Sequence, residues 1–402
     1  MGEEKEPQQE IFRYRWVVLG SWLLSGVACF MVVSTFGLLL PSISSELHLT
    51  PGQQGLLGSA AFWGNLTLAI PLSWWTSRYP AKMLTTVTLI LGILLLLLQS
   101  WAPGFAYLIV GRLGFGISLL ARLPARTLLT RQWFPQRETV LVNSLGNAMF
   151  GVITGGGLIA TPFILNYLED DWRTTLRFLS ILIIVLTILW ITLGREKEIF
   201  GDSTNLSQGG AGSIKGALGH RDLWIAGFAF FGTGVSWAAF LSFFPTLMLD
   251  TYGISLQWSG IVLALGILAG GVSGLGIGYV AMTTGHRKPI LQVLGVLMVC
   301  TYAGMTMTSS LTLLLALSVL NGVAQGFWPV LYTVPFQLPG IRSRDVGIAL
   351  SLIMMMVSAG TVVGPLATGL LQEALGTLKV ALLIVSFFSI ALSVSGTFLR
   401  RT

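Results

Sequence analysis

Long apolar segments, separated by short polar ones, follow one another along almost all of the 402-residue chain. The hydrocarbon core of a bilayer is about 30 Å thick, so a helix that crosses it needs about 20 apolar residues. By this measure the pattern predicts twelve membrane-spanning helices. Those of the first half are expected at 16–41, 54–76, 83–101, 104–129, 138–166 and 173–193. Those of the second half are expected at 223–247, 258–281, 289–308, 311–334, 346–371 and 378–398.

The composition agrees with an all-helical membrane protein. Hydrophobic residues make up 53% of the chain and charged residues 10%, whereas an average soluble domain has about 25% charged residues. A water-soluble enzyme and a disordered chain are therefore excluded. The sequence contains no metal-ligand cluster, catalytic triad or nucleotide motif, so we expect no metal, no cofactor and no enzymatic activity. The glycine-rich runs 151–157 and 266–278 lie inside predicted spans, where they favour close helix packing.

The positive charges predict the orientation of the helices. If the N-terminus is cytoplasmic, 18 of the 23 Lys and Arg residues fall in cytoplasmic segments, three lie near the outer face, and two lie within a span. This bias places both termini in the cytoplasm, and we expect a multi-pass protein of the bacterial inner membrane. The net charge of +7 favours contact with anionic lipid headgroups rather than with nucleic acid.

The two halves of the chain repeat each other at a nearly constant offset. Pro41 and Pro245 are 204 residues apart, and Pro124 and Pro329 are 205 residues apart. Duplicated six-helix halves are typical of transporters whose halves rock about a site between them. The predicted division is a cytoplasmic tail, an N-terminal bundle, a Gly/Ser-rich cytoplasmic linker, a C-terminal bundle and a short cytoplasmic tail, at 1–15, 16–193, 194–222, 223–398 and 399–402.

The loop after the second span resembles a motif of the major facilitator superfamily. This loop, SWWTSRYPAK at 73–82, keeps Arg78 and Lys82 of the family's G-x-x-x-D-R-x-G-R-K motif, with serine replacing the first Gly and the Asp. The second copy of the loop keeps Gly278 and Arg287. The resemblance, which extends over nearly the whole chain, implies a twelve-helix fold of two pseudo-symmetric bundles, alternating access and a monomer. It also implies a gating role for these four residues.

Two further segments are similar to the organic-anion branches of that family. The fourth span begins with GRLGFG at 111–116, similar to the family's Arg-x-x-x-Gly motif. The segments RQWFPQRE at 131–138 and Trp172–Arg173 are similar to the anion:cation symporter and oxalate/formate-like groups.

Two arginines lie within the predicted spans, whereas no acidic residue falls at a span centre and all three histidines lie in loops. A buried guanidinium costs several kcal/mol unless it has a partner or a wet cavity. Arg112 either supports the site or holds helix ends by bonding backbone carbonyls. Arg122 either binds an anionic substrate group through paired hydrogen bonds or belongs to the inner positive belt. Arg126, one turn further on, is expected to extend to the interface.

Polar and aromatic residues of other spans are candidates for the rest of the binding site. Asn321 and Gln325 share one helix face in the tenth span, the repeat counterpart of the fourth. The alternative role of such residues is hydrogen bonding between helices, worth about 1 kcal/mol each. Besides the two arginines, the predicted substrate-binding residues are Asn65, Asn147, Trp237, Asn321, Gln325 and Tyr332.

These observations predict secondary active or facilitative transport of a small, carboxylate-like organic anion. Because no buried acid is present to carry a proton, a coupling proton or other ion either accompanies the substrate or uses an acid at a span end, such as Glu46 or Asp250. One alternative is efflux of a neutral, amphipathic or lipid-like compound, in which both arginines are structural. A second alternative is a membrane sensor that binds a ligand without moving it.

Overall fold

A computed structural model describes residues 5–68, 79–120, 122–135, 138–196, 219–337 and 343–399. Within these ranges the regular structure is helical and contains no strand. The predicted linker 194–222 lies mostly outside the described residues, as does Arg78 of the predicted gating set.

The N-terminal half comprises seven helices in the described part of the chain. Two of them begin at side-chain caps. Thr50 and Gln53 form a reciprocal capping box at the start of α2, and Asp171 accepts a hydrogen bond from the Arg173 amide at the start of α8. The helices are α1 (Lys5–Leu47), α2 (Pro51–Thr67), α4 (Ala81–Ser100), α5 (Phe105–Ser118), α6 (Arg122–Trp133), α7 (Thr139–Tyr167) and α8 (Trp172–Leu193).

The C-terminal half follows the same plan. Gly253 and Gly285 end α11 and α12 with φ of +64° and +67°, a left-handed conformation that glycine adopts without steric cost. The helices are α11 (Arg221–Tyr252), α12 (Leu256–Thr284), α13 (Arg287–Met307), α14 (Leu311–Gln325), α15 (Trp328–Tyr332), α16 (Ser343–Leu375), α17 (Leu378–Ser386) and α18 (Ile390–Phe398), with short 3₁₀ segments η2 (Val334–Gln337) and η3 (Phe387–Ser389).

Ten of the described helical segments are long and apolar enough to cross a membrane. The remaining two predicted spans are the second and the fourth. The second is represented by α2, and the rest of that span lies outside the described residues. The fourth is not one continuous helix, because it divides into α5 and α6.

The fourth and tenth spans are interrupted at corresponding positions of the two halves. Pro124 lies in the first turn of α6, and Pro329 lies in the first turn of α15. Proline has no amide hydrogen to donate to the preceding turn, so it is well suited to the first turn of a helix, where that donor has no partner. A tight i to i−3 hydrogen bond from the Arg122 amide to the Leu119 carbonyl spans the first break. The repeat therefore places one helix break in each half.

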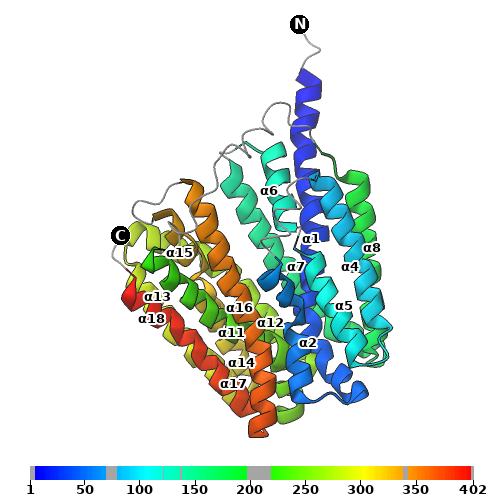
Figure 1. The fold of residues 1–402 in the computed structure, drawn as a ribbon, viewed down its shortest axis with the longest axis vertical. Helices are drawn as coiled ribbons and strands as arrows, with labels where there is room; N and C mark the ends of the chain where they lie inside the picture. Colours follow the sequence, from blue (N-terminus) through cyan, green and yellow to red (C-terminus); the bar gives the residue numbers. More distant parts are fainter. Residues whose placement is uncertain are drawn as a thin grey trace.

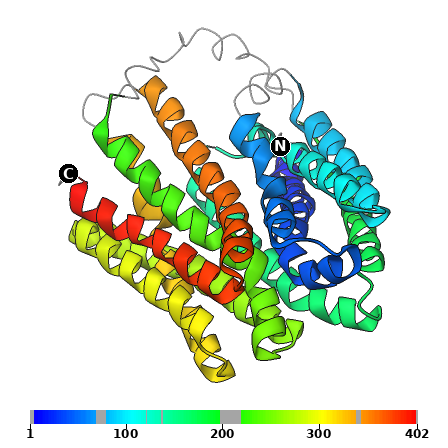
Figure 2. The ribbon, with the colours of Figure 1, turned by 60° about the horizontal axis from the view of Figure 1, so that its bottom comes forward.

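Figure 1 shows the N-terminal half, including α4, α5 and α8, beside the C-terminal half, including α13, α17 and α18. In the described part of the chain the halves meet most extensively through three helix pairs: α2 with α16, α7 with α12, and α1 with α11. In Figure 2 the orange α16 lies next to the blue α2.

The closest packing between the halves lies at the ends of the helices that border the loops 48–50, 253–255 and 376–377, which we call the outer end. A Cβ atom at Gly37 of α1 would overlap the Leu241 carbonyl of α11, and one at Gly55 of α2 would lie 2.6 Å from the Pro365 carbonyl of α16. Four buried apolar residues fill the space between α1, α7, α11 and α12 at this end: Leu38, Leu158, Leu241 and Ala264. The outer end is therefore closed by backbone-to-backbone contact.

Candidate functional site

Arg122 is the first residue of α6, directly after the break in the fourth span. Its guanidinium lies against Gly26 of α1, where an added Cβ would be 2.7 Å from Nη2. The Nε atom is buried and has no hydrogen-bond partner. Within the described part of the chain, no carboxylate forms an ion pair with Arg122.

Arg126, one turn further along α6, turns toward α7. Its Nη2 donates a hydrogen bond to Oδ1 of Asn143 on α7, 3.2 Å away, and its guanidinium occupies the space that a side chain at Gly146 would fill. Its Nε is also buried without a partner. The sequence signal for this site residue was the i, i+4 spacing of two arginines in a segment without acids.

Arg112 has a different environment, deep in the N-terminal half. Its Nε donates to the Leu57 carbonyl of α2 at 2.9 Å, and its Nη2 donates to the Val33 carbonyl of α1 at 3.4 Å. Its Cζ lies 3.4 Å from the centre of the Phe36 ring, and the residue is 3% exposed. These contacts bind three helices together, which fits the structural alternative for Arg112 better than substrate binding.

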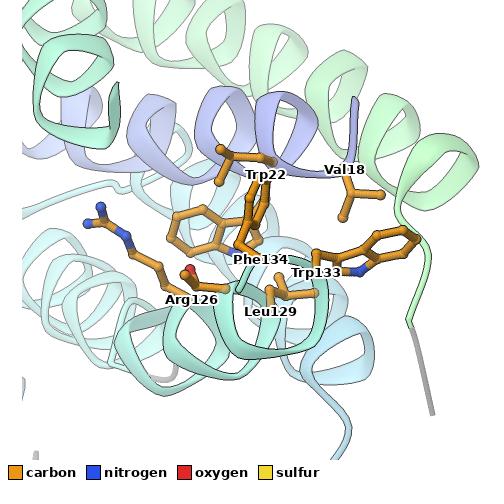
Figure 3. Close-up of a pocket in the computed structure, with 8 residues that line it drawn as sticks. Val18, Trp22, Arg126, Leu129, Trp133 and Phe134 are labelled. Atoms are coloured by element: carbon orange, nitrogen blue, oxygen red, sulfur yellow. The ribbon is translucent and has the colours of Figure 1, made fainter. Parts of the chain in front are cut away.

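A small pocket lies between α1 and α6 (Figure 3). Figure 3 shows the guanidinium of Arg126 pointing away from the apolar side chains that line this pocket. Because the pocket is apolar and lies within one half, we do not assign the substrate to it. The lining residues are Val18, Leu19, Trp22, Arg126, Leu129, Thr130, Trp133 and Phe134.

The structure brings together Asn321 and Gln325 in the C-terminal half. Nε2 of Gln325 donates to Oδ1 of Asn321, and Nδ2 of Asn321 donates to Oγ1 of Thr301 on α13, both at 2.9 Å. Asn321 is buried, so this amide chain links α13 to α14 next to the break in the tenth span. This chain of hydrogen bonds fits the interhelical role, and Gln325 is its member nearest to the helix break.

Aromatic residues of the C-terminal half lie near the same break and at the boundary between the halves. Trp237 packs edge-on against Phe62 of α2, with ring centres 6.5 Å apart, so it joins the two halves. Trp328 and Tyr332 follow the break, with ring centres 6.3 Å apart, and Tyr332 is 40% exposed. Of these rings, Trp237 is the one that contacts the other half.

The remaining predicted site residues are not joined to the arginines. Asn65 is half-buried on α2 and Asn147 is exposed on α7. Neither forms a hydrogen bond with another predicted site residue in the described part of the chain.

The predicted gating residues that are described lie at helix starts and at the break. The Lys82 amide, with that of Ala81, donates to the carboxylate of Glu196 at the start of α4. Gly278 of α12 faces Pro329, whose Cβ would be 3.5 Å from a Cβ at that glycine. Arg287 is the first residue of α13.

At the outer end, Trp172 and Arg173 bind Glu46. The Trp172 indole Nε1 donates to Oε2 of Glu46 at 2.6 Å, and Arg173 forms an ion pair with the other oxygen. Arg173 also donates to the Ala102 carbonyl at 2.8 Å. This dipeptide therefore connects α8 to α1 and to the loop before α5.

Comparison with known proteins agrees with this architecture. Residues 22–339 match the family model of the Major Facilitator Superfamily. The chain is 23% identical over 398 residues to the hexuronate transporter of Bacillus subtilis (strain 168), covering 92% of this chain and 91% of that protein. It is 24% identical over 390 residues to the probable galactarate/D-glucarate transporter GarP of Escherichia coli (strain K12), covering 85% of each.

A solved structure has the same fold. The crystal structure of a bacterial homolog to the human lysosomal transporter Spinster, in an inward-facing and unoccupied conformation, superposes with a TM-score of 0.72 at 19% identity, covering 96% of this chain and 95% of that chain. The paired helix breaks, the two contacting halves and the family match lead to one conclusion: this chain is a multi-pass membrane protein that belongs to the major facilitator superfamily.

Proposed function

We propose that this protein carries a small organic anion across the cytoplasmic membrane by alternating access, and that Arg122 binds the anionic group. The observation that carries the proposal is the buried Nε of Arg122, which has no partner and faces no carboxylate among the described residues. A guanidinium in this situation is costly unless it is neutralised. The planar donors of arginine fit the two oxygens of a carboxylate.

The relatives support an anionic substrate. One is named for a hexuronate, a monocarboxylate, and the other for galactarate and D-glucarate, which are dicarboxylates. Both names describe sugar acids of similar size. They support the anion class while leaving the charge of this protein's substrate open.

Alternating access is supported by the arrangement of the two halves. Their closest contacts lie at the outer end, on Gly37 and Gly55. Arg122 lies opposite Gly26, eleven residues from Gly37 along α1, which is about 16 Å of helix. Separation of the outer contacts would open a path from outside toward Arg122, whereas the present arrangement corresponds to a state closed on that side.

The proposal is tested by thermal unfolding of the purified protein with D-glucuronate, D-glucarate, succinate and nitrate. A ligand that binds only the folded state stabilises it by about 2.7 kcal/mol at one hundred times its Kd. We expect at least one of these anions to raise the Tm of the wild type but not of Arg122→Gln, and expect Arg122→Lys to respond weakly because it loses the paired donors.

Arg177→Gln is the matched control. It removes the same charge from α8, near Asp171 at the outer end, and should keep the response. If no anion raises the Tm while neutral amphipathic compounds do, or if anions stabilise Arg122→Gln as well as the wild type, the anion proposal is wrong. An anion that binds but produces no flux in proteoliposomes would indicate the sensor alternative.

A further inference from the structure

We infer that the substrate carries two negative charges, one bound by Arg122 and the other by Arg126. The inference rests on the proposed function and adds the charge of the substrate, which the relatives leave open. It depends on how α6 holds its two arginines.

Both guanidinium groups lie against glycines of different neighbouring helices. Arg122 lies against Gly26 of α1, and Arg126 occupies the space beside Gly146 of α7. A Cβ atom added at Gly26 would be 2.7 Å from Nη2 of Arg122, and one added at Gly146 would be still closer to Nη2 of Arg126. Both separations are shorter than a van der Waals contact. Each guanidinium therefore lies beside a neighbouring helix at a point where a glycine leaves room for it.

The two arginines are close enough to repel each other. They are four residues apart on one face of α6, where like charges destabilise a helix, and each is within electrostatic range of the other. Each has a buried Nε without a partner. The hydrogen bond that Arg126 makes is to the neutral amide of Asn143.

Nothing in the described part of the chain compensates these two charges. The ion pairs found there are Arg15 with Glu138 and Arg173 with Glu46, and neither involves α6. A monoanion would neutralise one arginine and leave the other without a countercharge. An anion with two carboxylates, or one doubly charged oxyanion, would neutralise both.

Tyr332 is a candidate for a further donor from the other half. It follows the break in the tenth span and is 40% exposed. A hydroxyl group here can donate to the second anionic group. The second charge would then be the part of the substrate nearest to the C-terminal half.

The test compares anions of equal length that differ in one charge: D-glucarate with D-gluconate, and succinate with butyrate. Calorimetric titration of the purified wild type should give a Kd at least tenfold lower for the dianion of each pair. Arg126→Gln should reduce this preference to less than threefold while still binding the monoanion, whereas Arg126→Lys should keep it. Arg122→Gln should lose both ligands.

Equal affinity of the wild type for the members of both pairs would overturn the inference, and so would a preference that survives in Arg126→Gln. If Arg126→Gln does not fold, Gly146→Ala displaces the same guanidinium and should remove the preference instead. The proposed function fails separately, if none of the four anions binds the wild type. If monoanions bind as tightly as dianions and this binding requires Arg122, the proposed function is supported and only the inference of a second substrate charge is wrong.

Discussion

Glu373 of α16 accepts a hydrogen bond from the Gly52 amide in the first turn of α2, with Oε2 and N 3.2 Å apart. The contact joins the two halves at the outer end, and it places a carboxylate at the positive end of a helix dipole. Because donor and acceptor belong to different halves, the bond breaks whenever the outer end opens.

Glu373→Gln should therefore favour opening of the outer end. Loss of the carboxylate weakens both the hydrogen bond and the dipole interaction, which together are worth about 1 kcal/mol at an exposed site. The reporter is Ser242→Cys in a background without Cys29 and Cys300, because Ser242 of α11 is buried beside Gly37 of α1 and Gly58 of α2. In Glu373→Gln this cysteine should react several-fold faster with an impermeant thiol reagent. Glu169→Gln, in another outer loop, is the control and should not change the rate. An unchanged rate in Glu373→Gln would show that the bond does not hold the halves together.

Gly37→Ala should abolish transport without unfolding the protein. The added methyl group would overlap the Leu241 carbonyl of the other half, so the outer end cannot close fully. Gly20→Ala on the same helix is the matched control, because a Cβ there meets no atom within 4 Å. Flux in proteoliposomes should fall at least tenfold in Gly37→Ala and remain normal in Gly20→Ala, with similar Tm values. Normal flux in both variants would mean that this contact is dispensable.

Arg112→Gln and Arg122→Gln should affect stability in opposite ways. Arg112→Gln removes charged hydrogen bonds to two helices and the contact with Phe36, and should lower the free energy of unfolding by about 2 kcal/mol. Arg122→Gln removes an uncompensated buried charge and should leave the stability unchanged or raise it. Denaturant unfolding in detergent micelles measures both. Equal destabilisation by the two variants would indicate that Arg122 is structural.

Glu46 and Arg173 should show a measurable coupling energy. Their ion pair also includes the Trp172 indole, so each partner is held in one geometry. A double-mutant cycle of Glu46→Gln and Arg173→Gln should give about 1 kcal/mol, because the pair is only partly exposed. Additive effects of the two substitutions would show that the pair contributes nothing of its own.

Hydropathy and charge predicted most of the fold, because the length of a span and the distribution of positive charge can be read directly along the sequence. They did not predict the division of the fourth and tenth spans, although Pro124 and Pro329 were matched as repeat landmarks. Averaged hydropathy is not sensitive to a missing amide hydrogen. Prolines at equivalent positions do not mark a break by themselves, because α1 and α11 continue through Pro41 and Pro245.

The candidate site was less predictable. The Asn321–Gln325 contact follows from helical spacing alone. The environment of Arg126 could not be predicted in this way, because it depends on which helix lies beside α6. In the sequence, Gly146 has no charged residue within one helix turn that would indicate a contact with an arginine. Arg112 and Arg122 look alike in the sequence, and their neighbours in the fold distinguish them. Arg112 donates to the carbonyls of Leu57 and Val33, whereas Nε of Arg122 has no partner.

The glycine contacts at the outer end have a consequence for the balance between closed and open states. Gly37 has no side chain that loses rotamer freedom when it contacts the Leu241 backbone. The contact therefore forms and breaks with no change in side-chain entropy at the glycine. Closure at this point therefore carries little of the entropic cost that an interface of long side chains would have. The free-energy difference between the two states can stay small, so both remain populated and a modest difference in substrate affinity is enough to shift them.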